Sequence, residues 1–166
     1  MKQILLFTLA SFFALTARSQ NNNAEPPYKR FPSFPPIKLL SPDSVSYFTK
    51  DNLKKKSAAM LMLFNPDCDH CRKETEEIIQ NIEKFKNIQI VMATTMPYEI
   101  MKSFIEEYKL DQYDNISVGR DFQYFLPTFF KISNLPFLAF YNKNKDLISV
   151  FEGSLGVPKI LIEFGK

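Results

Sequence analysis

The stretch MLFNPDCDHCRKETEE, residues 62–77, decides the fold and carries both cysteines of the chain, Cys68 and Cys71. It overlaps a continuous apolar run at 58–64, which is typical of a strand buried on both faces. After the first cysteine, apolar residues recur at helical spacing and predict a helix over 69–86. Cys68 thus lies where a buried strand passes into a helix. Free backbone N–H groups and the positive end of the helix dipole stabilise a thiolate at such a position.

Two cysteines separated by two residues are a poor structural crosslink. A disulfide between Cys68 and Cys71 closes so short a loop that it contributes only about 2 kcal/mol, against roughly 4 to 5 kcal/mol for a long loop. A closed zinc site needs four ligands, and the only cysteine and histidine residues of the chain are these two and His70, so no metal is expected. The spacing and its context instead predict a redox pair. Cys68 is expected to be the attacking thiolate, and Cys71, one turn inside the helix, the resolving thiol.

The rest of the chain alternates between strand and helix patterns. Short apolar runs predict strands, and amphipathic stretches with helical spacing predict helices. Further strands are expected at 88–94, 116–119, 136–141 and 147–151, and further helices at 97–110, 122–132 and 158–164. Helices between strands, followed by a hairpin and a last helix, indicate an α/β sandwich with a mixed central sheet.

The N-terminal residues have the pattern of an export signal. Lys2 precedes an apolar run over 4–15, and Ala17-Arg18-Ser19 has small residues at the two positions that a signal peptidase reads. The pattern predicts cleavage between Ser19 and Gln20 and export to the periplasm or an equivalent space. An uncleaved membrane anchor is the alternative, although a membrane span needs about 20 apolar residues.

A proline-rich segment follows the predicted signal. Six prolines lie between Asn21 and Pro42, so this segment is expected to form neither a helix nor an inner strand. Its apolar residues Phe31, Phe34 and Ile37 are expected to let the last part of the segment lie on the domain surface. The predicted parts of the chain are a signal peptide, an extended proline-rich tether and a single domain, at 1–19, 20–36 and 37–166.

The charge of the mature chain is close to zero. The sequence has 21 basic and 18 acidic residues, and the loss of Lys2 and Arg18 with the signal leaves 19 basic ones. The only basic run, Lys54-Lys55-Lys56, precedes an apolar strand and reads as a solvated loop. Nucleic-acid binding is therefore not expected.

The stretch at 62–77 resembles the active-site strand and helix of the thioredoxin superfamily. It is closest to exported thiol-disulfide oxidoreductases of the TlpA and ResA type, which are AhpC/TSA–redoxin-like. Leu135-Pro136 stands before a downstream strand, where this family carries a cis-proline facing the dithiol, and Gly153 follows the hairpin as the family's glycine does. Glu74 matches an acidic residue that TlpA-like and ResA-like proteins carry one turn beyond the second cysteine. The resemblance implies a thioredoxin fold, a three-layer α/β/α sandwich with a mixed central sheet, in 37–166.

The resemblance also implies what the site residues do. Cys68 and Cys71 form a redox disulfide, and no cofactor takes part. Glu74 is implied as a proton acceptor, and the backbone beside Pro136 as an edge that holds an extended substrate segment. His70 resembles the histidine of oxidising members, and a cation there would stabilise the thiolate. The supporting residues are therefore His70, Glu74, Leu135 and Pro136.

Two positions depart from the family pattern. Asp67 replaces the aromatic residue that usually precedes the first cysteine, and Met62 stands where cytoplasmic thioredoxins have a buried Asp. The proton handling that depends on this buried Asp is therefore not expected here.

The expected function is thiol-disulfide exchange. Protein disulfides or dithiols are the expected substrates, and a membrane thiol protein is the expected electron donor or acceptor. Two alternatives stay open. A peroxiredoxin-like peroxidase normally has Thr three residues before its reactive cysteine, where this chain has Asn65. The other alternative is a thioredoxin-fold binding module in which the cysteine pair has no catalytic role.

Overall fold

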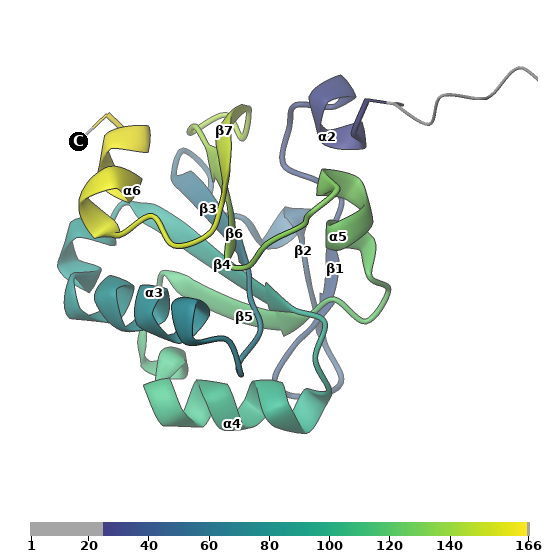
Figure 1. Cartoon of the computed structure of the whole chain (residues 1–166), viewed down its shortest axis with the longest axis vertical. Coiled ribbons are helices and arrows are strands. Elements are labelled where there is room, and N and C mark those ends of the chain that lie inside the picture. The colour runs from purple at the N-terminus through teal and green to yellow at the C-terminus, as the bar shows by residue number, and fades with distance from the viewer. Residues whose placement is uncertain (1–24, 166) are drawn as a thin grey trace, which may run out of the picture.

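The computed structural model describes residues 25–165, and Figure 1 shows how their elements are arranged. The predicted signal peptide and its cleavage site lie outside the described residues. In chain order, the elements are α2 (Pro27–Arg30), β1 (Lys38–Leu40), β2 (Tyr47–Thr49), the 3-10 helix η1 (Lys50–Asn52), β3 (Ala58–Leu63), α3 (Asp69–Gln80), η2 (Ile82–Phe85), β4 (Ile88–Thr94), α4 (Tyr98–Tyr108), η3 (Leu110–Gln112), β5 (Ile116–Arg120), α5 (Phe125–Phe130), β6 (Phe137–Tyr141), β7 (Leu147–Glu152) and α6 (Val157–Glu163).

A seven-stranded mixed sheet forms the middle layer, with the strand order β2-β1-β5-β4-β3-β6-β7. β4 pairs in parallel with both β3 and β5, whereas β6 runs antiparallel to both β3 and β7. All of β4 and nearly all of β3 are buried, which is why their sequences are almost continuously apolar. The mixed sheet agrees with the prediction.

Helices cover both faces of this sheet (Figure 1). Successive side chains of a strand point to opposite faces, so β3 contributes to two cores. Met60 and Met62 pack in the core that includes residues of α3, α4 and α6, while Leu61 and Leu63 pack in the core that includes residues of α5. The predicted three-layer α/β/α sandwich is thereby confirmed.

The proline-rich segment differs from the prediction. Pro27–Arg30 forms a short helix, and β1 is an inner strand, because it lies between β2 and β5. The expectation of neither helix nor inner strand between Asn21 and Pro42 is therefore wrong. Pro27 is tolerated because it occupies the first turn of α2, where a missing N–H has no intrahelical partner to lose. β1 contains no proline at all.

Two aromatic residues of this segment have opposite environments. Phe34 is 1% exposed, and its ring centroid lies 4.8 Å from that of Tyr141 in β6, whereas Phe31 is 60% exposed. Ile37, at 3% exposure, is also in the core. Phe34 and Ile37 thus belong to the core, so the last part of the segment is built into the domain rather than resting on its surface.

Two further differences concern local structure. The helix predicted over 69–86 ends at Gln80, and the 3-10 helix η2 begins two residues later. Asn81 separates them, and its side-chain amide donates to the backbone oxygen of Glu77 at 2.9 Å. β2 was not predicted. The other predicted elements are present, with ends shifted by a few residues.

Tyr141→Phe is expected to raise the free energy of unfolding by about 1 kcal/mol, because an unsatisfied buried hydroxyl costs about 1–3 kcal/mol. Tyr141 Oη is buried and has no hydrogen-bond partner among residues 25–165, and burial raises the pKa of Tyr141 above its ordinary value. Urea unfolding followed by circular dichroism measures the change. Tyr98→Phe is the control, because the Tyr98 hydroxyl donates to Pro42 O at 2.5 Å and its removal should not stabilise the protein. A less stable Tyr141→Phe protein would show that the hydroxyl has a stabilising partner.

Candidate active site

Cys68 and Cys71 lie at the junction of β3 and α3. Cys68 is the N-cap residue of α3 and is half-buried, while Cys71 lies in the first turn and is completely buried. Asn65 stabilises the loop between β3 and α3 with two hydrogen bonds. Its backbone oxygen accepts the Cys68 N–H at 3.0 Å, and its Oδ1 accepts the Asp67 N–H at 2.9 Å. Cys71 is thus more deeply buried than Cys68, and their roles as resolving and attacking thiols stay a prediction.

The Cys71 thiol has a strongly perturbed pKa. Burial is the main cause that raises it to about 12, and the neighbouring Cys68 and Glu74 act in the same direction, whereas a hydrogen bond with the backbone of Asn65 acts against them. Both cysteines are free thiols in the structure. Cys71 is therefore a protonated thiol at neutral pH, as a resolving cysteine in its resting state is expected to be.

His70 is exposed in the first turn of α3, between the two cysteines in sequence. Its side chain makes no hydrogen bond or ion pair within residues 25–165. Asp67 and Asp69, on either side of Cys68, are exposed as well. The role of His70 in stabilising a Cys68 thiolate stays a prediction.

Glu74 is completely buried, and its carboxylate points to the loop between β7 and α6. It accepts hydrogen bonds from Ser154 Oγ at 2.5 Å, from Leu155 N at 2.9 Å and from Gly156 N at 3.2 Å. No pattern around Glu74 in the sequence points to these partners, which lie about 80 residues further along the chain. Its implied role as a proton acceptor stays a prediction, and the contacts observed are those of a carboxylate that holds a loop.

The Leu135–Pro136 peptide bond is cis, as the resemblance implies. The next residue, Phe137, pairs with Leu63 at the end of β3, so the chain enters β6 at the edge of the sheet where it leaves β3 toward Cys68. Leu135 is partly buried and packs against both cores. The structure thus brings the predicted proline to the same edge of the sheet as the dithiol.

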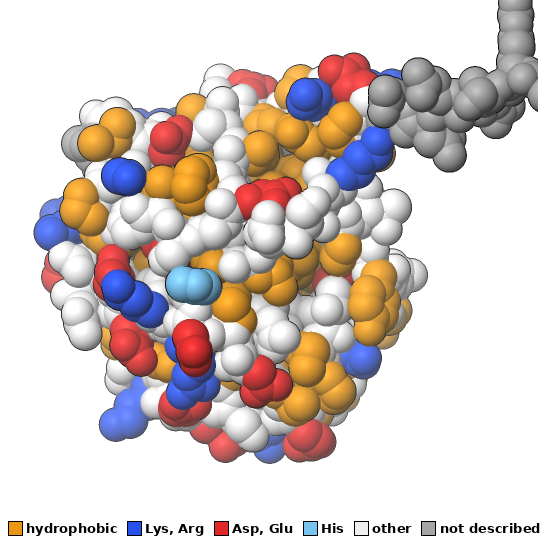
Figure 2. All heavy atoms as spheres, in the orientation of Figure 1, with side chains coloured by type: hydrophobic (Ala, Val, Ile, Leu, Met, Phe, Trp, Pro, Cys, Tyr) orange, Lys and Arg blue, Asp and Glu red, His pale blue; other side chains and the backbone are white. Residues whose placement is uncertain are grey.

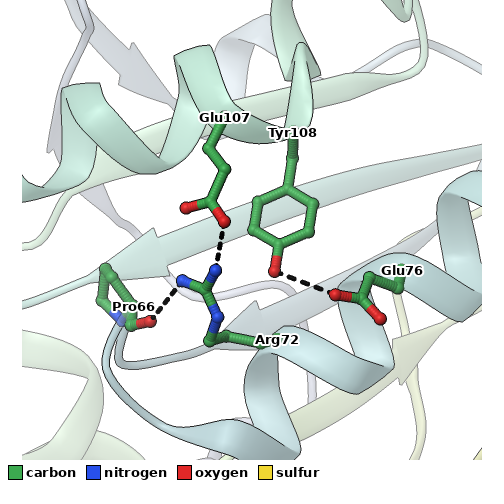
Figure 3. Close-up of polar contacts among 5 residues, drawn as sticks. All are labelled: Pro66, Arg72, Glu76, Glu107 and Tyr108. Atoms are coloured by element: carbon green, nitrogen blue, oxygen red, sulfur yellow. Dashed lines mark hydrogen bonds and ion pairs between the residues drawn. The ribbon is translucent and has the colours of Figure 1, made fainter.

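Arg72, which follows Cys71, connects the active-site loop to α4 (Figure 3). Its guanidinium donates to Pro66 O at 3.3 Å, pairs with the Glu107 carboxylate and lies 5.3 Å from the centre of the Tyr108 ring. Tyr108 Oη in turn donates to Glu76 Oε1 at 3.2 Å. Sequence reasoning missed this set of contacts. Because the Arg72–Glu107 pair is partly exposed, we attribute to it a geometric role in fixing the loop rather than a large contribution to stability.

No group of three or more His, Cys, Asp or Glu side chains within residues 25–165 is arranged to hold a metal ion. No helix in this part of the chain is long and apolar enough to cross a membrane. Basic and acidic side chains are interspersed on the face shown in Figure 2, and hydrophobic side chains reach the surface between them.

Comparisons with known proteins give matches among solved structures only. No known protein family matches the sequence, and no curated protein is significantly similar to it. A secreted disulfide oxidoreductase of Mycobacterium tuberculosis, homologous to Escherichia coli DsbE, is 16% identical with a TM-score of 0.65, over 78% of this chain and 95% of that one. StoA from Bacillus subtilis is 13% identical with a TM-score of 0.60, over 77% and 95% of the two chains.

A third solved structure extends the same pattern. The exposed lipoprotein thioredoxin of Streptococcus pneumoniae is 16% identical with a TM-score of 0.61, over 78% of this chain and 97% of that one. At such low identities the likeness shows the fold. The chain therefore has the thioredoxin fold, and its structural neighbours include proteins described as a secreted disulfide oxidoreductase, as the C-terminal domain of a putative thiol-disulfide oxidoreductase and as an exposed lipoprotein thioredoxin.

Proposed function

We propose that the chain is an exported oxidoreductase that exchanges electrons with disulfides in other molecules through Cys68 and Cys71. The observation that carries the proposal is the asymmetry of the pair at the start of α3. Cys68 is half-buried at the helix terminus, and Cys71 is completely buried one turn later. An attacking and a resolving cysteine need this difference in access.

The proposed reaction proceeds in two exchanges. The Cys68 thiolate attacks one sulfur of a substrate disulfide, forms a mixed disulfide and releases the other substrate sulfur as a thiolate, which takes up a proton. Cys71 then loses its proton and attacks the Cys68 sulfur. The Cys68–Cys71 disulfide forms, and the second substrate thiolate leaves. The substrate disulfide gains two electrons, and the cysteine pair is oxidised by two.

A second thiol partner completes the proposed cycle. A dithiol protein of the membrane would reduce the Cys68–Cys71 disulfide by the same exchange, or the cycle would run in reverse and oxidise substrate dithiols. Export is supported by the signal-like pattern at 1–19 and by neighbours that are described as secreted or as an exposed lipoprotein. The proposed substrates are therefore disulfides of exported proteins.

The peroxidase alternative has less support. Enzymes of that class normally have Thr three residues before the reactive cysteine, and Asn65 occupies this position here. A resolving cysteine one turn away in the same helix is also the arrangement of a dithiol exchanger.

Cys71→Ala is expected to trap mixed disulfides. Without Cys71, the bond between Cys68 and the substrate has no internal thiol to resolve it, so the adduct accumulates. Incubation of the reduced variant with a disulfide-bonded protein, followed by non-reducing electrophoresis and mass mapping, detects it. The wild type should instead release reduced substrate, and the variant that lacks both cysteines is the control. A binding module would show no adduct above this control, and a peroxidase would consume peroxide faster than it exchanges with disulfides.

A further inference from the structure

Residues 152–156, which we call the brace, contact both α3, which carries the dithiol, and the loop at 133–136, which leads into β6. We infer that the brace sets the distance between α3 and the loop at 133–136, and that Glu152 is a positioning residue for the binding of disulfide substrates. This inference rests on the proposed function and assigns the control of substrate affinity to a segment outside the reacting residues.

The carboxylate of Glu152 holds the loop that leads to Pro136. Its Oε1 accepts the Ser133 N–H at 3.2 Å, and its Oε2 accepts the Asn134 N–H at 2.9 Å. The side-chain amide of Asn134 donates to the same Oε2 at 3.2 Å. One carboxylate therefore satisfies three donors of two consecutive residues, and hydrogen bonds to a charged acceptor are about twice as strong as neutral ones.

The next residue of the brace continues this attachment. Gly153 N–H donates to Pro136 O at 2.8 Å. The backbone of Gly153 has a φ of 98°, which a residue with a side chain rarely adopts, so glycine is required there by conformation. The loop at 133–136 is thus fixed at both of its ends by neighbouring residues of one segment.

The other end of the brace is attached to the helix that carries the dithiol. Ser154, Leu155 and Gly156 all donate to the carboxylate of Glu74, one turn beyond Cys71 in α3. Because Glu74 is completely buried, losing these donors would leave a buried carboxylate without partners. The carboxylates of Glu152 and Glu74 therefore hold the two ends of the brace, one on the proline loop and one on the helix.

This arrangement separates positioning from chemistry. Neither Glu152 nor the loop at 133–134 belongs to the reacting pair, so weakening their contact leaves both thiols in place. It does release the backbone beside Pro136, which the resemblance to the thioredoxin superfamily implies as the edge that holds an extended substrate segment. Loss of a contact that holds the substrate equally in the ground state and the transition state weakens binding and leaves the chemical step nearly unchanged.

Turnover of a disulfide-bonded peptide with dithiothreitol as electron donor tests the inference. Glu152→Ala is expected to raise KM about tenfold while kcat falls less than threefold, because a contact that holds the substrate equally in the ground state and the transition state contributes to KM rather than to kcat. Glu152→Gln keeps one acceptor oxygen and is expected to restore part of the affinity. Glu99→Ala removes an exposed carboxylate of α4 and should match the wild type. Ser154→Ala removes only the hydroxyl donor to Glu74 and should also raise KM. This variant tests the inference if Glu152→Ala does not fold.

An unchanged KM in Glu152→Ala and Ser154→Ala, with an active wild type, would overturn the brace and leave the proposed function standing. A kcat that falls in step with the melting temperature, at constant KM, would also overturn it, since Glu152 would then be merely structural. Absence of turnover in the wild type itself would instead reject the proposed function, and the inference with it.

Discussion

Phe34→Ala is expected to lower the free energy of unfolding by about 3–5 kcal/mol, the range for truncation of a buried phenylalanine to alanine. Phe34 is 1% exposed, and its ring packs on Tyr141 of β6. Its backbone N–H also donates to Lys145 O at 2.9 Å, so the residue is fixed beside the β6–β7 hairpin. Removal of the ring leaves a cavity beside Tyr141 of β6. Urea unfolding followed by circular dichroism measures the loss.

Phe31→Ala provides the matched control for Phe34→Ala. It removes the same side chain three residues earlier, but Phe31 is 60% exposed, and surface substitutions usually change stability by about 0.5 kcal/mol or less. Equal losses in the two variants would show that residues around Phe34 form a tether on the surface rather than a part of the core.

The central strands of the fold were predictable because burial on both faces leaves a local trace in the sequence. The runs at 58–64, 88–94 and 136–141 are apolar over lengths that suit strands, and they became β3, β4 and β6. β1 and β2 leave no such trace. Each is three residues long, and β1 joins the main sheet through a single pairing, Leu40 with Arg120. Three residues carry too little periodicity to distinguish a strand from a loop.

Gly119 shows what local reasoning lacks. A Cβ atom at this position would lie 2.7 Å from Leu39 Cβ and 3.1 Å from Leu40 O, so β1 can approach β5 only because residue 119 is glycine. Gly119 can be read directly from the sequence, but no neighbouring residue indicates that β1 is the strand that packs against it. The requirement arises from a contact between segments 80 residues apart.

In the candidate site, too, the features set by neighbouring residues were predictable, and those set by contacts between distant residues were not. The positions of Cys68 and Cys71 followed from a contiguous strand and helix, and the structure has them there. The contacts of Glu74 with 154–156, of Glu152 with 133–134 and of Arg72 with Glu107 each join residues that are distant in the chain. Hydrogen-bond partners of this kind depend on the packed fold, and the residue types alone do not select among many possible donors and acceptors.

In the proposed thiol-disulfide exchange, the buried position of Cys71 sets the order in which the two thiols react. A resolving thiol that ionised as easily as the first would compete with it for substrate, because the thiolate is the nucleophile. Burial prevents this competition by keeping Cys71 protonated and covered until the mixed disulfide has formed on Cys68. The separation of the two sulfurs by one helical turn therefore affects their reactivity by making one more exposed than the other, as well as by setting the distance between them.

Cys71 in the folded protein is expected to react with iodoacetamide about 1,000-fold more slowly than Cys71 in the urea-unfolded protein at pH 8. Burial raises its pKa from an ordinary value of 9.0 to about 12, and each pH unit changes the thiolate fraction tenfold below the pKa. The rate in the folded protein should therefore rise about tenfold per pH unit between pH 7 and 10, since the raised pKa keeps the thiol protonated throughout this window. Mass mapping of the reduced protein after brief labelling at each pH measures both cysteines, with the unfolded protein as control. Labelling of Cys71 faster than Cys68 would reverse the assigned roles, and a rate that levels off near pH 9 would show that burial does not raise the pKa of Cys71.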